Sequence, residues 1–173
     1  PTLLFDGEDV YFASTSRDKD DRDGIFMCKI NPYTGEKLSE SVRISHGCGG
    51  ICPEGPHIYK LNGKYYLLLA EGGTEYGHMV TMQRADSPFG PYEASPHNPI
   101  LSHRDNPDGS ISCTGHADLE VDQNGNWWLV CLGIRPSCTP QRGLKLHHLG
   151  RETFLSPVIW NEEGWPVVGN NGR

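Results

Sequence analysis

The segment Pro53–Glu54–Gly55–Pro56 holds a single carboxylic acid between residues that restrict the backbone on both sides. Glu54 stands at the expected start of a strand, where this frame holds its side chain rigidly and partly out of water. A carboxyl group held in this way could give a proton to a bound molecule. Glu54 is therefore a candidate proton donor.

Three further residues are candidates for binding. Arg151 carries a planar fork of donors that suits vicinal hydroxyl groups, and the alternative is a surface ion pair with Glu152. Thr74 follows two glycines that let a ligand approach the backbone closely, and the alternative is an ordinary turn threonine. His116 falls at the inner end of an expected strand, near a central channel, and the alternative is a structural histidine.

A repeat organises the chain around these residues. Three segments share an apolar strand, a Gly-containing turn and an aromatic-rich strand, with Asp-Gly at 6–7 and Asn-Gly at 62–63 and 125–126. These dipeptides supply the positive φ angles of two-residue hairpin turns. Further strand-like runs follow each hairpin, and four strands per repeat is typical of propeller blades. We expect an all-β fold with blade-like repeats at about 1–50, 51–110 and 111–173.

The repeat also predicts where the candidate residues lie. The start of the first strand of a blade and the loop after the second strand fall on the same rim of a propeller. For the second repeat these are Glu54 and the loop 71–78, and for the third they are 114–116 and 134–152. This rim is the predicted site.

Composition excludes several classes of function. The net charge of −7 and the lack of a Lys/Arg cluster argue against a nucleic-acid partner. No apolar run is long enough to span a membrane, so we expect a soluble chain. The six cysteines include no zinc-ligand pattern and are expected to be free thiols. They leave the compartment open between cytoplasmic and secreted.

Four motifs, in order along nearly the whole chain, resemble glycoside hydrolase family 43, which acts mainly on xylosides and arabinosides. The resemblance implies a five-bladed β-propeller, of which this chain supplies about three blades and the C-terminal part of the catalytic domain. It implies inverting hydrolysis of terminal β-xylosyl or α-L-arabinofuranosyl residues of plant-wall oligosaccharides, as in xylan degradation. The motifs are CPEGPHIYK, LLLAEGGTEYGH, CTGHADLE and HHLGRETFLSPVIWNEEGWPVV.

The resemblance assigns roles to the candidate residues. Glu54 corresponds to the catalytic acid, Arg151 to an arginine that binds the sugar, and Thr74 to a residue near the sugar or the acid. His116 corresponds to a histidine near the sugar and near a structural calcium ion in the central channel. No cofactor is required by the chemistry that the resemblance implies.

The family uses two further carboxylates, an Asp base and an Asp that tunes the acid, and both correspond to positions before Pro1. We therefore expect the isolated chain to be inactive and its missing blades to come from a parent chain or a partner chain. A non-catalytic carbohydrate-binding propeller and a complementing fragment stay open as alternatives. Fructan-acting five-bladed enzymes are disfavoured, because their Arg-Asp-Pro triplet does not occur here.

Overall fold

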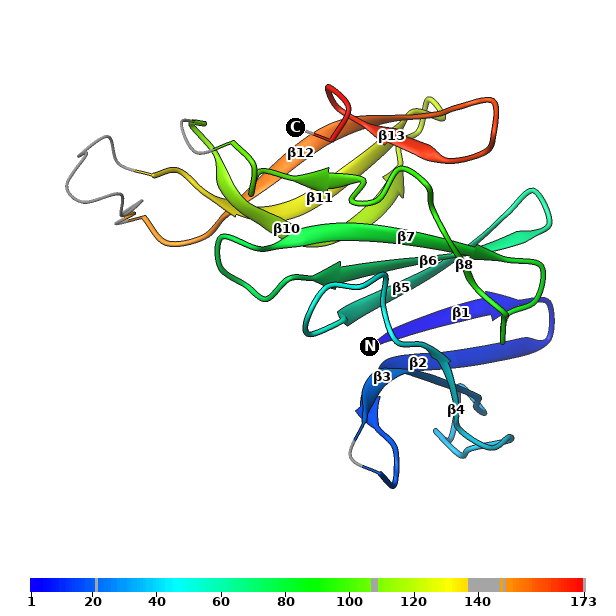
Figure 1. The fold of residues 1–173 in the computed structure, drawn as a ribbon. Coiled ribbons are helices and arrows are strands. Elements are labelled where there is room, and N and C mark those ends of the chain that lie inside the picture. Colours follow the sequence, from blue (N-terminus) through cyan, green and yellow to red (C-terminus); the bar gives the residue numbers. More distant parts are fainter. Residues whose placement is uncertain (21, 107–108, 137–146, 148, 173) are drawn as a thin grey trace.

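The computed structural model describes residues 1–20, 22–106, 109–136, 147 and 149–172, and this part of the chain contains strands and loops but no helix. The strands form three antiparallel sheets that follow one another along the chain, with the second sheet between the other two (Figure 1). The all-β prediction is confirmed. Accordingly, the described residues offer no helix long and apolar enough to cross a membrane.

Each sheet begins with the predicted hairpin and adds its later strands outward. The first sheet has the order β1 (Thr2–Asp6), β2 (Asp9–Arg17), β3 (Asp23–Lys29), β4 (Val42–Ser45). The second has the order β5 (Glu54–Leu61), β6 (Lys64–Glu71), β7 (Met79–Ala85), β8 (Glu93–Ala94), with β9 (Leu101–Ser102) also paired to β7. The third has the order β10 (Ser112–Val121), β11 (Trp127–Ile134), β12 (Glu152–Trp160), β13 (Pro166–Val168).

The three predicted hairpins form, but only one has the predicted turn. Asn62–Gly63 is a two-residue turn in which both φ angles are positive, at 51° and 78°. The turn between β1 and β2 is Gly7–Glu8, one residue later than predicted, because Asp6 still pairs with Asp9. The connection between β10 and β11 is a five-residue loop over 122–126, so the prediction of a two-residue turn at 125–126 was wrong.

Asp122 explains the longer loop and gives a testable pH dependence. Its carboxylate accepts the backbone N–H of Asn124 at 2.8 Å and both the backbone and side-chain amides of Asn126 at 2.9 Å. These hydrogen bonds, chiefly those from Asn126, lower the pKa of Asp122 from 3.8 to about 2. Because the folded pKa is depressed, the stabilisation is present above about pH 4 and is lost as the pH falls toward 2.

We expect a carboxyl NMR titration of Asp122 to show a midpoint near pH 2, and Asn126→Ala to move that midpoint upward toward 3.8. Asn124→Ala is the matched control, because Asn124 contributes its backbone amide and the substitution keeps that group. A titration midpoint near 3.8 for Asp122 in the unaltered protein would show that these hydrogen bonds do not stabilise its carboxylate.

The second sheet is buried on both faces, and its central strand shows why. Successive side chains of a strand point to opposite faces. Tyr65, Leu67 and Leu69 of β6 join the core against the first sheet. Tyr66 and Leu68 join the core against the third sheet. One continuous apolar strand therefore supplies two cores.

The outer faces of the first and third sheets are apolar but uncovered in this chain. On the first sheet Phe5 is 65% exposed and Phe12 is 36% exposed, and a hollow of about 380 Å³ lies beside Phe12. On the third sheet Leu155 and Ile159 of β12 are 61% and 67% exposed. Apolar patches of this kind mark surfaces that meet another protein segment.

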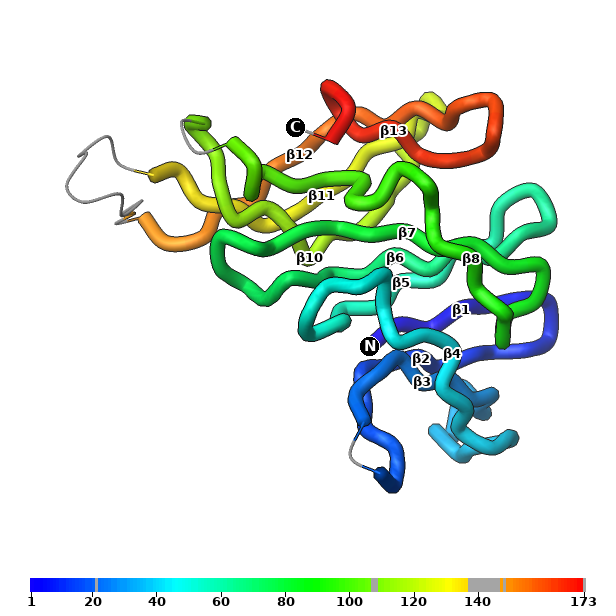
Figure 2. The backbone as a smooth tube through the Cα atoms, viewed as in Figure 1, coloured from blue at the N-terminus to red at the C-terminus, as the bar shows by residue number. Residues whose placement is uncertain are grey.

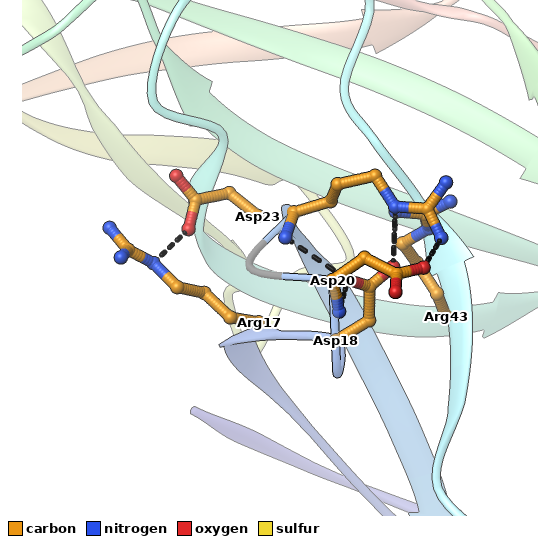
Figure 3. A network of polar contacts seen from close by, with 6 residues as sticks. Arg17, Asp18, Asp20, Asp23 and Arg43 are labelled. Atoms are coloured by element: carbon orange, nitrogen blue, oxygen red, sulfur yellow. Dashed lines mark hydrogen bonds and ion pairs between the residues drawn. The ribbon is translucent and has the colours of Figure 1, made fainter.

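The described residues of the acidic and basic run at 17–23 form an exposed polar network. The Asp18 carboxylate accepts the backbone N–H groups of Asp20 and Arg22 and pairs with Arg43 of β4 at 3.3 Å (Figure 3). Arg17 pairs with Asp23 at 2.7 Å across the start of β3. The charges neutralise one another and tie the loop to the sheet.

The prediction of free thiols is confirmed for Cys28, Cys48, Cys52 and Cys131. Cys138 lies outside the described residues.

Candidate functional site

The candidate site lies on the rim where β5 and β10 begin and β6 ends. Figure 2 shows the β6–β7 connection and the start of β12 on the same side of the three sheets. Both β5 and β10 are irregular near this rim, with register shifts between Glu54 and His57 and between Gly115 and Asp118. The bulges break the strict alternation of side chains, so residues near them turn toward the rim.

Glu54 and His116 face each other across the two bulges. The Glu54 carboxylate lies 3.8 Å from Nδ1 of His116, and the two side chains are 45% and 44% exposed. Gly55 and His116 both have positive φ, at 55° and 50°. A Cβ on Gly55 would lie only 2.7 Å from Nε2 of His116. The glycine is therefore needed for the backbone angle and for the close approach of the imidazole.

Arg151 and Thr74 bring two distant loops together on the same rim. Nη1 of Arg151 donates a hydrogen bond to Oγ1 of Thr74 at 2.6 Å, although the residues are 77 positions apart in sequence. Glu152 pairs instead with Arg135, at 3.3 Å. The alternative ion pair between Arg151 and Glu152 therefore does not form, and among the described residues Thr74 is the hydrogen-bond partner of the guanidinium.

His78 belongs to this group and was missed by the sequence analysis. Its side chain is buried, Nδ1 lies 3.1 Å from the carbonyl oxygen of Cys113, and no described residue bonds to its Nε2. Burial is the main cause that lowers the pKa of His78, and the hydrogen bond with the Cys113 carbonyl and the charge of Glu54 oppose it in part. His78 therefore lies beside the site as a buried imidazole that loses its proton more readily than an exposed histidine.

The position of His78 could have been suspected from its motif. It closes EGGTEYGH at the end of the rim loop, directly before β7. What sequence could not show is that Gly115 of β10 packs on the imidazole, where a Cβ would lie 2.4 Å from the ring. The histidine thus fixes the distance between the second and third sheets at the rim.

His57 and Asp118 contact each other beside the site rather than within the Glu54–His116 pair. Nδ1 of His57 lies 3.3 Å from the Asp118 carboxylate. That carboxylate also accepts the hydroxyl of Tyr59 and the backbone N–H of Leu119. These contacts join β5 to β10 beside the site.

The expected calcium ion was tested against the donor set. Calcium takes about six to eight oxygen ligands, largely carboxylates and carbonyls. Within the described ranges no group of three or more His, Cys, Asp or Glu side chains is placed to hold a metal ion. His116 offers a nitrogen and faces Glu54, and a calcium ion near it stays a prediction.

Comparison with known proteins identifies the family. Residues 1–166 match the model described as glycosyl hydrolases family 43. The chain belongs to this family. It is 46% identical over 173 residues to the non-reducing end α-L-arabinofuranosidase BoGH43B of Bacteroides ovatus, with 99% of this chain and 31% of that protein aligned. It is 50% identical over 177 residues to a xylosidase/arabinosidase of Butyrivibrio fibrisolvens, with 97% of this chain and 33% of that protein aligned.

Solved structures of family 43 agree. The xylan β-1,4-xylosidase from Bacillus halodurans C-125 superimposes with a TM-score of 0.88 at 34% identity, over 99% of this chain and 33% of that one. The chain spans about a third of the length of these relatives. The predicted five-bladed propeller architecture, with about three blades in this chain, is confirmed.

Proposed function

We propose that this family 43 chain is the acid-bearing part of a glycosidase that removes terminal β-xylosyl or α-L-arabinofuranosyl residues from plant-wall oligosaccharides with inversion. The observation that carries the proposal is the placement of Glu54, half-exposed on the rim beside His116. The names of the relatives as arabinofuranosidase and xylosidase/arabinosidase support the substrate class.

In the proposed reaction Glu54 gives its proton to the glycosidic oxygen as the bond from that oxygen to the anomeric carbon breaks. A water molecule adds to the anomeric carbon from the opposite face and loses its proton to a carboxylate base. The sugar leaves as a hemiacetal of inverted configuration, and the shortened oligosaccharide leaves as the alcohol. The exposed fraction of Glu54 lets it reach the leaving oxygen.

Arg151 and Thr74 supply sugar binding in this proposal. Thr74 accepts one donor of Arg151 and so holds the guanidinium plane in place. The other donors of the fork can then meet two neighbouring hydroxyl groups of the terminal sugar. His116 lies beside Glu54, and we propose that it contacts the same sugar.

We propose further that the chain's repeats, at about 1–50, 51–110 and 111–173, act as consecutive blades, and that other blades supply the base and the tuning carboxylate. The outer faces of the first and third sheets support this, because exposed apolar side chains lie on both, among them Phe12 and Leu155. Those blades can belong to the same polypeptide or to a partner chain.

The test is an assay of the complete propeller on aryl β-xyloside and aryl α-L-arabinofuranoside, with the anomer of the first product observed by NMR. We expect turnover of at least one substrate with inversion, and no turnover by the 173 residues alone. Retention of configuration would contradict the mechanism. Binding of oligosaccharides without turnover would favour a carbohydrate-binding propeller.

Gly55→Ala is expected to impair the site by displacing His116. The new Cβ would lie 2.7 Å from the imidazole, and the positive φ would add about 1–2 kcal/mol of backbone strain. Gly63→Ala is the matched control, because its φ is also positive but no atom lies within 4 Å of the new Cβ. Thermal unfolding should show a similar loss of stability for both variants, whereas only Gly55→Ala should lower kcat/KM, by about 10²-fold. Equal kcat/KM values would contradict a role for this contact.

A further inference from the structure

Glu71 is a buried carboxylate that the proposed reaction does not use. It is the last residue of β6 and is 1% exposed. By alternation along β6 it shares a face with Leu67 and Leu69, which belong to the apolar core between the first and second sheets. A carboxylate at the end of such a row is unfavourable unless hydrogen-bond donors surround it.

Three donors meet this carboxylate. Oε1 accepts the backbone N–H of Cys48 at 2.8 Å and the hydroxyl of Thr81 at 2.5 Å. Oε2 accepts the backbone N–H of Gly50 at 2.7 Å. Two of the donors therefore belong to the loop 46–53, which we call the approach loop because it leads directly into Glu54.

The approach loop is packed so closely on Glu71 that it has no room for side chains at two positions. A Cβ on Gly47 would lie 2.9 Å from Oε2 of Glu71, and a Cβ on Gly50 would lie 2.8 Å from the same oxygen. The far side of the loop is held as well, because the N–H of Gly72 donates to the carbonyl of Ile51 at 2.8 Å. The carboxylate thus acts as the support on which the loop is folded.

The same contacts extend to the catalytic acid. The position of a Cβ on Gly47 lies 3.0 Å from Cβ of Pro53, so the loop folds back onto the residue that precedes Glu54. Pro53 is buried and restricts the backbone at the start of β5. A shift in the backbone of the approach loop would therefore move Pro53, and with it the Glu54 carboxylate.

A second pair of buried polar side chains fixes the beginning of the loop. The side chains of Ser45 and Gln83 hydrogen-bond to each other, with Nε2 of Gln83 at 2.8 Å from Oγ of Ser45. That hydroxyl also accepts the N–H of Gly47, at 3.0 Å. The loop is thus fixed at its start by Ser45 and in its middle by Glu71.

We propose that Glu71 is a positioning residue that sets the place of the general acid by holding the approach loop. The proposal rests on the proposed function of Glu54. Glu71 does not touch substrate, because it is buried and both its oxygens are engaged by the loop and by Thr81. Its effect on the reaction is to keep Glu54 within reach of the glycosidic oxygen.

The test uses substrates that differ in their need for an acid. The dinitrophenolate of a 2,4-dinitrophenyl glycoside departs without being protonated. The leaving group of a 4-methylphenyl glycoside or of an oligosaccharide needs a proton from the acid. Glu71→Gln in the complete propeller keeps the side-chain volume. Its NH2 group cannot accept a hydrogen bond from the N–H groups of the approach loop, so one of the contacts that hold the loop is lost. We expect kcat for the poor leaving group to fall by about 10²-fold, as for a misplaced catalytic group, with KM and the dinitrophenyl rate nearly unchanged.

Glu75→Gln is the matched control, because Glu75 is an exposed glutamate in the same rim loop and should keep both rates. Thr81→Val removes one hydrogen-bond donor to Glu71 and should lower kcat for the poor leaving group, by less than Glu71→Gln does. Thr81→Ser keeps a hydroxyl and should keep kcat near that of the unaltered enzyme. If Glu71→Gln does not fold, these two variants of Thr81 test whether Glu71 positions Glu54. Equal losses on both substrates, or no loss with any of the variants, would overturn the proposal.

Glu54→Gln in the same assays separates this inference from the proposed function. If Glu54→Gln loses activity only on the poor leaving group but Glu71→Gln loses both activities equally, Glu54 is the acid and Glu71 does not position it. If Glu54→Gln itself shows no dependence on the leaving group, the proposed function fails, and the positioning role of Glu71 fails with it.

Discussion

Replacing Glu54 by Gln in the complete propeller is expected to lower kcat/KM on xylo- or arabino-oligosaccharides by about 10²–10⁴-fold, the contribution typical of a general acid. Gln has nearly the same shape as Glu, so the strand start and the contact with His116 can persist, but the amide has no proton to give. Activity on a dinitrophenyl glycoside should be retained, because that leaving group departs as a stable anion.

Comparing the oligosaccharide with the dinitrophenyl glycoside distinguishes loss of the proton donor from other effects of the substitution. Loss on both would indicate that Glu54 supports the fold or binds the sugar, and no loss on either would place the proton donor elsewhere. Circular dichroism and the unfolding midpoint of the variant should match those of the unaltered enzyme, since Glu54 is half-exposed and the described contacts give it no hydrogen bond to lose. A stability change would therefore count against a purely chemical role.

The elements that position Glu54 could be predicted because they depend on local sequence. Asn62–Gly63 can adopt two positive φ angles, and the apolar runs on either side of it pair in the expected register. The same reasoning located the loop of Thr74 and the start of β12 on one rim. Repetition of this pattern three times was enough to predict blades.

The contacts within the rim depend on tertiary packing and could not be predicted in the same way. The bulges at Gly55 and Gly115 interrupt two strands where alternation alone predicts regular pairing. His78 is placed by its packing on Gly115, and Glu71 by backbone amides of a loop that precedes it by about 20 residues. A glycine in a strand near a functional motif indicates such a contact but does not identify the partner.

Phe12→Ala is expected to be strongly destabilising in the complete propeller although Phe12 lies on an outer face of this chain. The opposite face of the first sheet is already filled by the core that includes Leu4, Ile25 and Met27, so Phe12 cannot turn inward. If another blade packs on this face, truncation removes a fully buried aromatic ring and should lower the free energy of unfolding by about 3–5 kcal/mol.

Tyr33→Ala provides the control for this experiment, because Tyr33 is 96% exposed in the β3–β4 connection and should change the free energy of unfolding by less than about 0.5 kcal/mol. Chemical denaturation of the two variants measures the difference directly. A similarly small effect of Phe12→Ala would mean that no blade covers the first sheet. A large effect would support the packing of another blade on this face of the first sheet, over the hollow of about 380 Å³ beside Phe12.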